Sequence, residues 1–316
     1  MQNPVWILLM FLSLFITFCF GSIGDRSQFY NQCLYTCIRR NCINEGNFKT
    51  SPSIILLLLQ WSCKDDCSYN CMWKTVDIYI NNGLEIPQFY GKWPFVRILG
   101  FQEPASTIFS ILNFYSHWIM FKKFRKEIRS SYPMFYNYSY FSIVCLNGWI
   151  WSAIFHARDK QFTEIMDYSS AFAMVLTLLY CLFIRLTYKS KKLFVVLTCI
   201  YISILYIHLS HLWSGQINYG YNMTFNILIG FLTFAVTIVW WYYSKKKLPH
   251  VHYIGWFTVL SVLVTLLEVA DFPPFLWLLD AHSLWHASTI PLITLLYQFM
   301  IQDCTYLRAL EKRNYI

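Results

Sequence analysis

Two histidines four residues apart, His282 and His286, begin the last apolar stretch of the chain. This spacing places both side chains on one face of a helix. A third histidine, His156, ends an earlier apolar stretch, with Ser152 four residues before it and Asp167 eleven residues after it. Ionisable groups inside membrane-spanning segments are unfavourable by about 2.5–3.5 kcal/mol each on insertion scales, and they usually mark function. These five residues are therefore the candidates for chemistry.

Three neutral imidazoles at one depth in a membrane would form a zinc site of the catalytic kind, with a fourth position left for water. The ligands would be His156, His282 and His286. Zinc lowers the pKa of a bound water molecule from its bulk value to about 7, which supplies a nucleophile near neutral pH. Asp167 would then accept or orient the proton of the water. Ser152 would donate a hydrogen bond to the oxyanion that develops when an ester carbonyl is attacked.

Each candidate also has a structural interpretation. A histidine pair four residues apart is weak evidence for a metal by itself, and Ser152 has the alternative role of a hydrogen bond between helices. We interpret Glu103, just before the first long apolar segment, as a brace between helices, and Asp280 as a partner for an imidazole N–H. A single histidine at a helix end is more often interfacial, and this interpretation covers His117, His208, His211, His250 and His252.

The elements that would position these residues are membrane-spanning helices. The chain has 316 residues, 57% of them hydrophobic and 13% charged, which argues against a soluble single-core protein. Its net charge of +9 is not gathered as a nucleic-acid-binding face would require. Apolar segments long enough to cross a bilayer must be helical there, because lipid offers no partner to open backbone groups. Seven such segments occur, at about residues 104–121, 138–156, 163–186, 193–213, 223–243, 253–271 and 281–301.

The positive charges predict how these segments are oriented. The connections after the first, third and fifth segments and the C-terminal tail hold fifteen Lys and Arg residues, whereas the opposite connections hold two. The positive-inside rule therefore predicts seven spans with the N-terminal region in the lumen and the C-terminus in the cytosol. This topology brings Asp167 and the three candidate histidine ligands to the lumenal ends of three helices. They can therefore share one layer.

The N-terminal region carries the features of a secreted domain. An apolar run of about fifteen residues ends in small residues near Gly21 and Ser22, which predicts a signal peptide over residues 1–23, with an uncleaved helix as the alternative. Six of the eleven cysteines lie between positions 33 and 71. In an oxidising lumen such a cluster favours a disulfide framework, and a zinc cluster is the weaker alternative because no histidine accompanies it.

Cysteine spacing suggests one pairing among the fifteen that six cysteines allow. Each of two cysteine pairs is spaced i, i+4, which places both thiols on one helix face. An antiparallel helical hairpin would then form the disulfides Cys33–Cys71, Cys37–Cys67 and Cys42–Cys63.

The candidate residues also form a recognisable pattern. Ser-x3-His, an Asp eleven residues later and a late His-x3-His resemble the CREST superfamily of seven-helix membrane hydrolases. This resemblance implies that His156, His282 and His286 bind Zn2+ and that Ser152 and Asp167 line the catalytic water. It also leaves an alternative, a seven-helix lipid receptor of the same superfamily with a structural zinc. A transporter would need polar residues through the middle of several spans.

Longer stretches give a more specific resemblance. GDRSQFYNQCLYTC, YGKWPFVRILGFQEPAS and DFPPFLWLLDAHSLWHASTIP are similar to the post-GPI-attachment-to-proteins factor three family, and the similarity covers about residues 24–303. It implies a phospholipase A2-type ester hydrolase that removes the sn-2 acyl chain from the phosphatidylinositol of GPI-anchored proteins. The implied partners are those proteins, their lipid and the bilayer, with no nucleic acid, and the implied location is the endoplasmic reticulum or Golgi membrane.

The expected fold is an all-α membrane protein, a seven-transmembrane-helix bundle with an N-terminal lumenal disulfide-rich helical domain. The expected division is a signal peptide over 1–23, a lumenal cysteine-rich domain over 24–100, a seven-transmembrane hydrolase domain over 101–303 and a cytosolic tail over 304–316.

Overall fold

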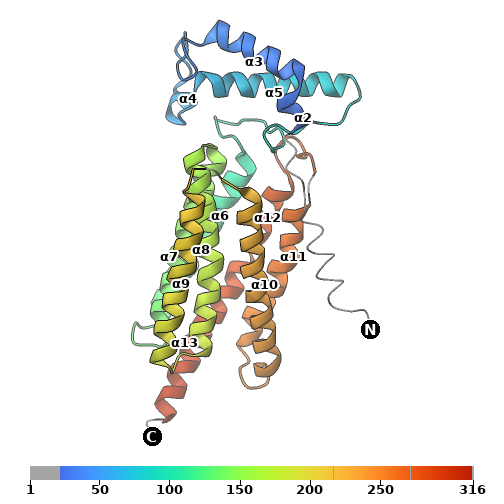
Figure 1. Ribbon diagram of the computed structural model, residues 1–316. Coiled ribbons are helices and arrows are strands. Elements are labelled where there is room, and N and C mark those ends of the chain that lie inside the picture. The colour runs from blue at the N-terminus through green and yellow to red at the C-terminus, as the bar shows by residue number, and fades with distance from the viewer. Residues whose placement is uncertain (1–21, 216, 271, 315–316) are drawn as a thin grey trace. The chain divides into compact units, whose positions relative to one another are not determined.

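The computed structural model describes residues 22–215, 217–270 and 272–314 (Figure 1). The predicted signal peptide lies outside these residues except for its last two. Every extended regular element in the described part of the chain is a helix, with only isolated bridges besides. The chain forms two compact units, the first ending at Pro94 and the second beginning at Phe95. The four-part domain division, including its tail, stays a prediction.

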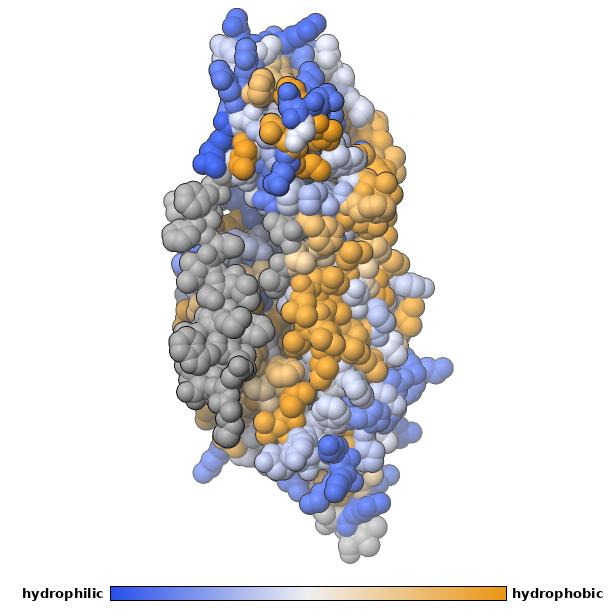
Figure 2. All heavy atoms as spheres, turned by 90° about the vertical axis from the view of Figure 1, so that its right-hand side faces the viewer, coloured by the Kyte–Doolittle hydropathy of each residue, from blue (hydrophilic) through white to orange (hydrophobic). Residues whose placement is uncertain are grey.

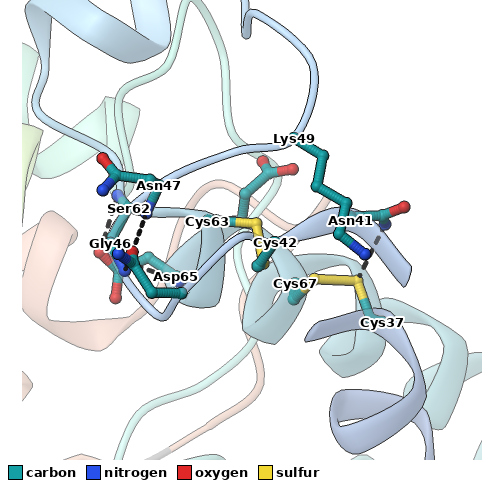
Figure 3. The surroundings of a disulfide bond; sticks show 12 residues. Cys37, Asn41, Cys42, Gly46, Asn47, Lys49, Ser62, Cys63, Asp65 and Cys67 are labelled. Atoms are coloured by element: carbon teal, nitrogen blue, oxygen red, sulfur yellow. Dashed lines mark hydrogen bonds between the residues drawn. A yellow bond between two sulfur atoms is a disulfide. The ribbon is translucent and has the colours of Figure 1, made fainter. Parts of the chain in front are cut away.

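The first unit is a disulfide-linked helical hairpin. Its two long helices pack against each other, and its helices are α2 (Ile23–Arg26), α3 (Gln28–Asn41), α4 (Ile54–Leu58) and α5 (Cys63–Asn81). The predicted pairing is confirmed, because the disulfides are Cys33–Cys71, Cys37–Cys67 and Cys42–Cys63 (Figure 3). All six sulfur atoms are therefore committed to covalent bonds, which excludes the zinc alternative for this cluster.

Local sequence fixes where α5 begins. The Ser62 hydroxyl accepts a hydrogen bond from the Asp65 backbone N–H at 3.1 Å, and the Asp65 carboxylate accepts one from the Ser62 N–H at 3.2 Å (Figure 3). This reciprocal capping box satisfies two otherwise open donors. The helix therefore begins at Cys63, whose sulfur forms a disulfide with Cys42, so the cap and the cross-link support the same register.

The second unit is a helical bundle (Figure 1). Each helix of a closed ring contacts the next, in the order α6, α7, α8, α10, α11 and the α12–α13 pair, and this pair also contacts α6. Helix α9 packs against α8. The bounds are α6 (Pro104–Glu127), α7 (Phe135–Ala157), α8 (Gln161–Leu186), α9 (Lys191–Leu212), α10 (Tyr219–Ser244), α11 (Val251–Val269), α12 (Ala281–Thr289) and α13 (Leu292–Asn314).

The last predicted span is divided in two. Pro291 lies between α12 and α13, and a proline has no N–H to continue the helical hydrogen-bond ladder. Ile290 instead donates to the Ala287 carbonyl at 3.3 Å. Helix α13 then continues to Asn314, so the predicted tail is helical as far as that residue.

Four of these helical segments are long and apolar enough to cross a membrane: α8, α9, α10 and the α12–α13 pair. Figure 2 shows hydrophobic side chains gathered over a flank of the bundle and hydrophilic ones toward its lower end. Helix α11 is apolar but shorter, and α6 is less apolar because buried polar residues such as Ser110 and Asn113 line one face. The chain is thus a membrane protein, and the count of seven spans stays a prediction.

A buried ionic cluster joins four segments at one end of the bundle. Asp303 on α13 is fully buried and accepts hydrogen bonds from Arg185 Nε at 2.6 and 2.7 Å and from the Tyr138 hydroxyl at 2.9 Å. His250 Nε2, just before α11, lies 3.0 Å from the same carboxylate. Tyr138 is eighteen residues before His156 on α7, which is about 27 Å along a helix.

Three of the five other histidines are buried in the bundle, and their interfacial interpretation stays a prediction. His117 is buried within α6, with Nδ1 3.3 Å from the Tyr297 hydroxyl. His208 is buried with Nε2 3.2 Å from Asn222 Oδ1, and His250 belongs to the ionic cluster. Each has a polar partner on another segment, which sequence position alone does not reveal. His211 and His252 are exposed.

Candidate metal centre

The structure brings the three predicted ligand histidines together. The Nε2 atom of His286 lies 2.9 Å from that of His282 and 3.2 Å from that of His156, and the last two Nε2 atoms are 3.3 Å apart. His156 comes from the last turn of α7, and the other two from α12. Two of the three side chains are buried and His282 is half-buried.

Helix α12 is positioned by its cap and by α6. The Asp280 carboxylate accepts from the Ser283 backbone N–H at 2.9 Å, and the Ser283 hydroxyl lies 3.0 Å from the Asp280 N–H, which forms a capping box. Asn113 on α6 donates to the His286 carbonyl at 2.8 Å and accepts from the Thr289 hydroxyl at 3.1 Å. These contacts hold the face that carries the two histidines toward α7.

The arrangement fits a cation. A neutral imidazole nitrogen is either an N–H donor or a lone-pair acceptor, so three Nε2 atoms in mutual contact cannot all be satisfied by one another. Two nitrogens bound at 2.0–2.1 Å to a tetrahedral zinc ion lie about 3.3–3.4 Å apart, close to the separations observed. Three imidazoles are a donor set that suits zinc.

A carboxylate orients one of these imidazoles. Glu103 Oε2 lies 2.7 Å from His156 Nδ1, and both side chains are buried. The Glu103 backbone N–H also donates to the His156 carbonyl at 3.0 Å. A proton on Nδ1 leaves the Nε2 lone pair directed at the other histidines, the arrangement typical of metal-binding histidines.

Sequence reasoning chose the wrong carboxylate for this contact. Asp280 caps α12, whereas Glu103, interpreted as a helix brace, is the group that contacts an imidazole. The sequence feature that could have indicated Glu103 is its predicted depth in the membrane. It lies directly before the first predicted span, at the same predicted lumenal end as His156.

Replacing Glu103 by Gln is expected to weaken zinc binding about 10–100-fold, because the amide is uncharged and orients the His156 ring less strongly. Zinc retained by the purified protein against a graded chelator measures this. Glu127→Gln is the matched control, since Glu127 is a half-exposed carboxylate on the same helix, 3.9 Å from Lys123 Nζ. Equal retention in both variants would show that Glu103 does not act on the metal site.

Ser152 lies one turn before His156 on α7 and is buried. Its hydroxyl is 3.0 Å from the Ser110 hydroxyl on α6, which itself donates to the Ser106 carbonyl at 2.8 Å. The hydrogen bond between helices given above as the alternative is therefore present. The role toward an oxyanion stays a prediction.

Asp167 lies in the second turn of α8 and is half-buried. Among the described residues, the ligand atoms of the three histidines lie within 4.8 Å of one another, and Asp167 does not belong to this group. One turn further along α8, Ser170 accepts a hydrogen bond from Asn147 of α7 at 3.1 Å. Asp167 is therefore near the helix face that meets α7, and its part in proton transfer stays a prediction.

Comparison with known proteins assigns the family. Residues 53–304 match the Per1-like family. The chain is 42% identical over 299 residues to post-GPI attachment to proteins factor 3 of Drosophila melanogaster, covering 92% of each chain. It is 39% identical to the GPI-specific phospholipase A2-like PGAP3 of Mus musculus, covering 95% of this chain and 94% of the relative, and 38% identical to that of Homo sapiens, covering 91% of each. No solved structure matches. The chain, with its histidine cluster within the matched residues, thus belongs to the Per1-like family.

Proposed function

We propose that this protein remodels GPI anchors as a zinc-dependent phospholipase A2-type hydrolase. Its substrate would be the sn-2 acyl ester of the phosphatidylinositol that anchors GPI-linked proteins. The observation that carries the proposal is the convergence of three Nε2 atoms within 3.3 Å, with a carboxylate on one ring. The names of the relatives, which refer to GPI attachment and a GPI-specific phospholipase A2, support the substrate class.

His156, His282 and His286 would hold the ion. When bound, zinc supplies Lewis acidity that acidifies water and polarises an ester carbonyl. Glu103 keeps the His156 ring in the tautomer that ligation requires. Ser152 would exchange its hydrogen bond to Ser110 for one to the ester carbonyl oxygen as negative charge develops there.

Proton transfer falls to Asp167 in this proposal. Its carboxylate takes a proton from the attacking water and returns it to the departing sn-2 alkoxide. A bond forms between the water oxygen and the acyl carbon, and the acyl carbon–alkoxide bond breaks. The products are a free fatty acid and a lysolipid.

The proposed placement is a multi-pass protein of the endoplasmic reticulum or Golgi membrane, with seven spans, a lumenal N-terminus and a cytosolic C-terminus. The distribution of Lys and Arg supports the orientation. The three disulfides support a lumenal position for the first unit, because disulfides persist in oxidising compartments.

Ser152→Ala tests the proposed chemistry. Loss of one oxyanion donor is expected to lower sn-2 hydrolysis about 10²–10³-fold while zinc is retained. Mass spectrometry of anchors from cells that express each variant reports the sn-2 chain. Ser142→Ala is the control, since the buried Ser142 lies on the same helix and donates to the Tyr138 carbonyl. Unchanged anchor lipids in Ser152→Ala cells would overturn the oxyanion role, and an unchanged lipid on loss of zinc would favour the receptor alternative.

A further inference from the structure

Two tight turns lead directly into the histidine site. In the first, Phe101 N–H donates to the Ile98 carbonyl at 2.9 Å, and Glu103 follows two residues later. In the second, Phe275 N–H donates to the Leu279 carbonyl at 2.7 Å, and α12 begins two residues after Leu279. Both turns belong to the second unit.

Backbone hydrogen bonds fix the two turns to each other and to the site. Val96 N–H, just before the first turn, donates to the carbonyl of Trp277 in the second at 3.0 Å. Gln102 N–H, just after the first turn, donates to the Ala157 carbonyl at 3.0 Å, next to His156. The turns are therefore adjacent parts of one framework that also holds a candidate metal ligand.

The residue types at the turn tips conflict with their backbone. The first tip has positive φ at both central residues, 51° at Leu99 and 80° at Gly100, and the second has 53° at Leu276 and 60° at Trp277. Such turns favour Asn, Asp and Gly, and only Gly100 meets this preference. Bulky residues held in the left-handed region are outliers that cluster at binding and active sites. Because leucine does not suit the backbone of these turns, we infer that the two leucine side chains serve to contact a partner rather than to stabilise the turns.

The apolar side chains of the two turns are exposed. Leu99 is 69% exposed, Phe275 66% and Leu276 68%. Helix α6 begins three residues after the first turn, and its Ile108 and Ile111 side chains are also exposed. In a membrane protein such a surface faces lipid chains, which identifies the chemistry that suits the tips.

We propose that Leu99, Phe275 and Leu276 form an apolar rim beside the histidine site that binds the acyl chains of a glycerophospholipid. The rim contacts the acyl chains of the lipid one after the other as they leave the bilayer, while the ester of the lipid approaches the histidines. Lipid binding here does not depend on hydrolysis, whereas the delivery of an ester rests on the proposed function.

Asn substitutions separate lipid binding from turn structure. Asn suits positive φ, so Leu99→Asn and Leu276→Asn are expected to leave the thermal unfolding temperature unchanged or higher. Loss of the apolar contact should raise KM for a vesicle-borne phosphatidylinositol about tenfold and leave kcat within about twofold. Leu84→Asn is the matched control, an exchange at a leucine that is 56% exposed in the first unit. A KM in both rim variants equal to that of the control would overturn the rim.

A second measurement is independent of catalysis. Phosphatidylinositol with a photoreactive diazirine in its acyl chain is incorporated into vesicles with wild-type protein or with His282→Ala. Cross-links are expected at residues 98–101 and 275–279 in both proteins, and their yield should fall at least about fivefold with both Asn substitutions. Wild-type protein that cross-links at these turns but releases no fatty acid would refute the proposed function and keep the rim. Wild-type protein that releases fatty acid without cross-links at these turns would refute the rim alone.

Discussion

Replacing His286 by alanine is expected to abolish zinc retention and to lower ester hydrolysis at least about a thousandfold. His286 is buried, and its Nε2 atom is within 3.2 Å of both other Nε2 atoms, so its loss removes one of three ligands. Two imidazoles do not complete a site of this kind. The contribution of a catalytic metal is several kcal/mol, and each 1.36 kcal/mol corresponds to about a tenfold change in rate.

Zinc per protein, measured by elemental analysis, and fatty acid released from vesicles test this prediction together. His211→Ala is the matched control, because His211 is an exposed histidine outside the cluster. Monodisperse size-exclusion profiles for both variants separate loss of metal from loss of fold. Stoichiometric zinc in His286→Ala would remove the basis for a three-histidine centre.

Replacing Asp303 by asparagine is expected to destabilise the bundle by about 3–5 kcal/mol, because it leaves the Arg185 guanidinium buried without its counter-charge. Asp303 is fully buried and accepts hydrogen bonds from Arg185 and Tyr138. The free energy of unfolding in mixed micelles is the quantity to measure. Glu311→Gln on the same helix is the control, since its partly exposed pair with Arg308 should contribute at most about 1 kcal/mol.

A double substitution tests the physical reason. Arg185→Met with Asp303→Leu removes both charges, so it should be less destabilising than Asp303→Asn alone. A double variant that is less stable than the single variant would show that the hydrogen bonds to Tyr138 and His250, rather than the uncompensated guanidinium, dominate.

Features that depend on regular spacing could be predicted from the sequence. The i, i+4 cysteines required a particular face of each helix, so the disulfide ladder followed once a hairpin was assumed. The distribution of Lys and Arg predicted one depth for His156, His282 and His286, which allowed them to share a layer, and the structure brings their Nε2 atoms together. Both predictions use a regular pattern in the sequence, the i, i+4 spacing along a helix or the alternation of Lys and Arg between successive connections.

Features that depend on lateral neighbours could not be predicted in this way. Depth alone does not say which helix faces which, so the contact of Glu103 with His156 and that of His250 with Asp303 were missed. Neighbours also decide how polar α6 is. Its serines and Asn113 lower its mean hydropathy, and they can be buried because they form hydrogen bonds within the bundle. Asp167 illustrates it too, since a shared depth does not fix the distance from its carboxylate to the imidazoles.

The break at Pro291 has a mechanical consequence. The nine residues of α12 carry two of the three imidazoles, and their backbone hydrogen bonds do not continue through the proline into α13. A small tilt of this short segment changes the distance from its two imidazoles to His156 without shifting Asp303, which is anchored in the longer segment beyond the proline. Under the proposed function, loading and loss of an ion would be accommodated by this short helix rather than by the remaining bundle.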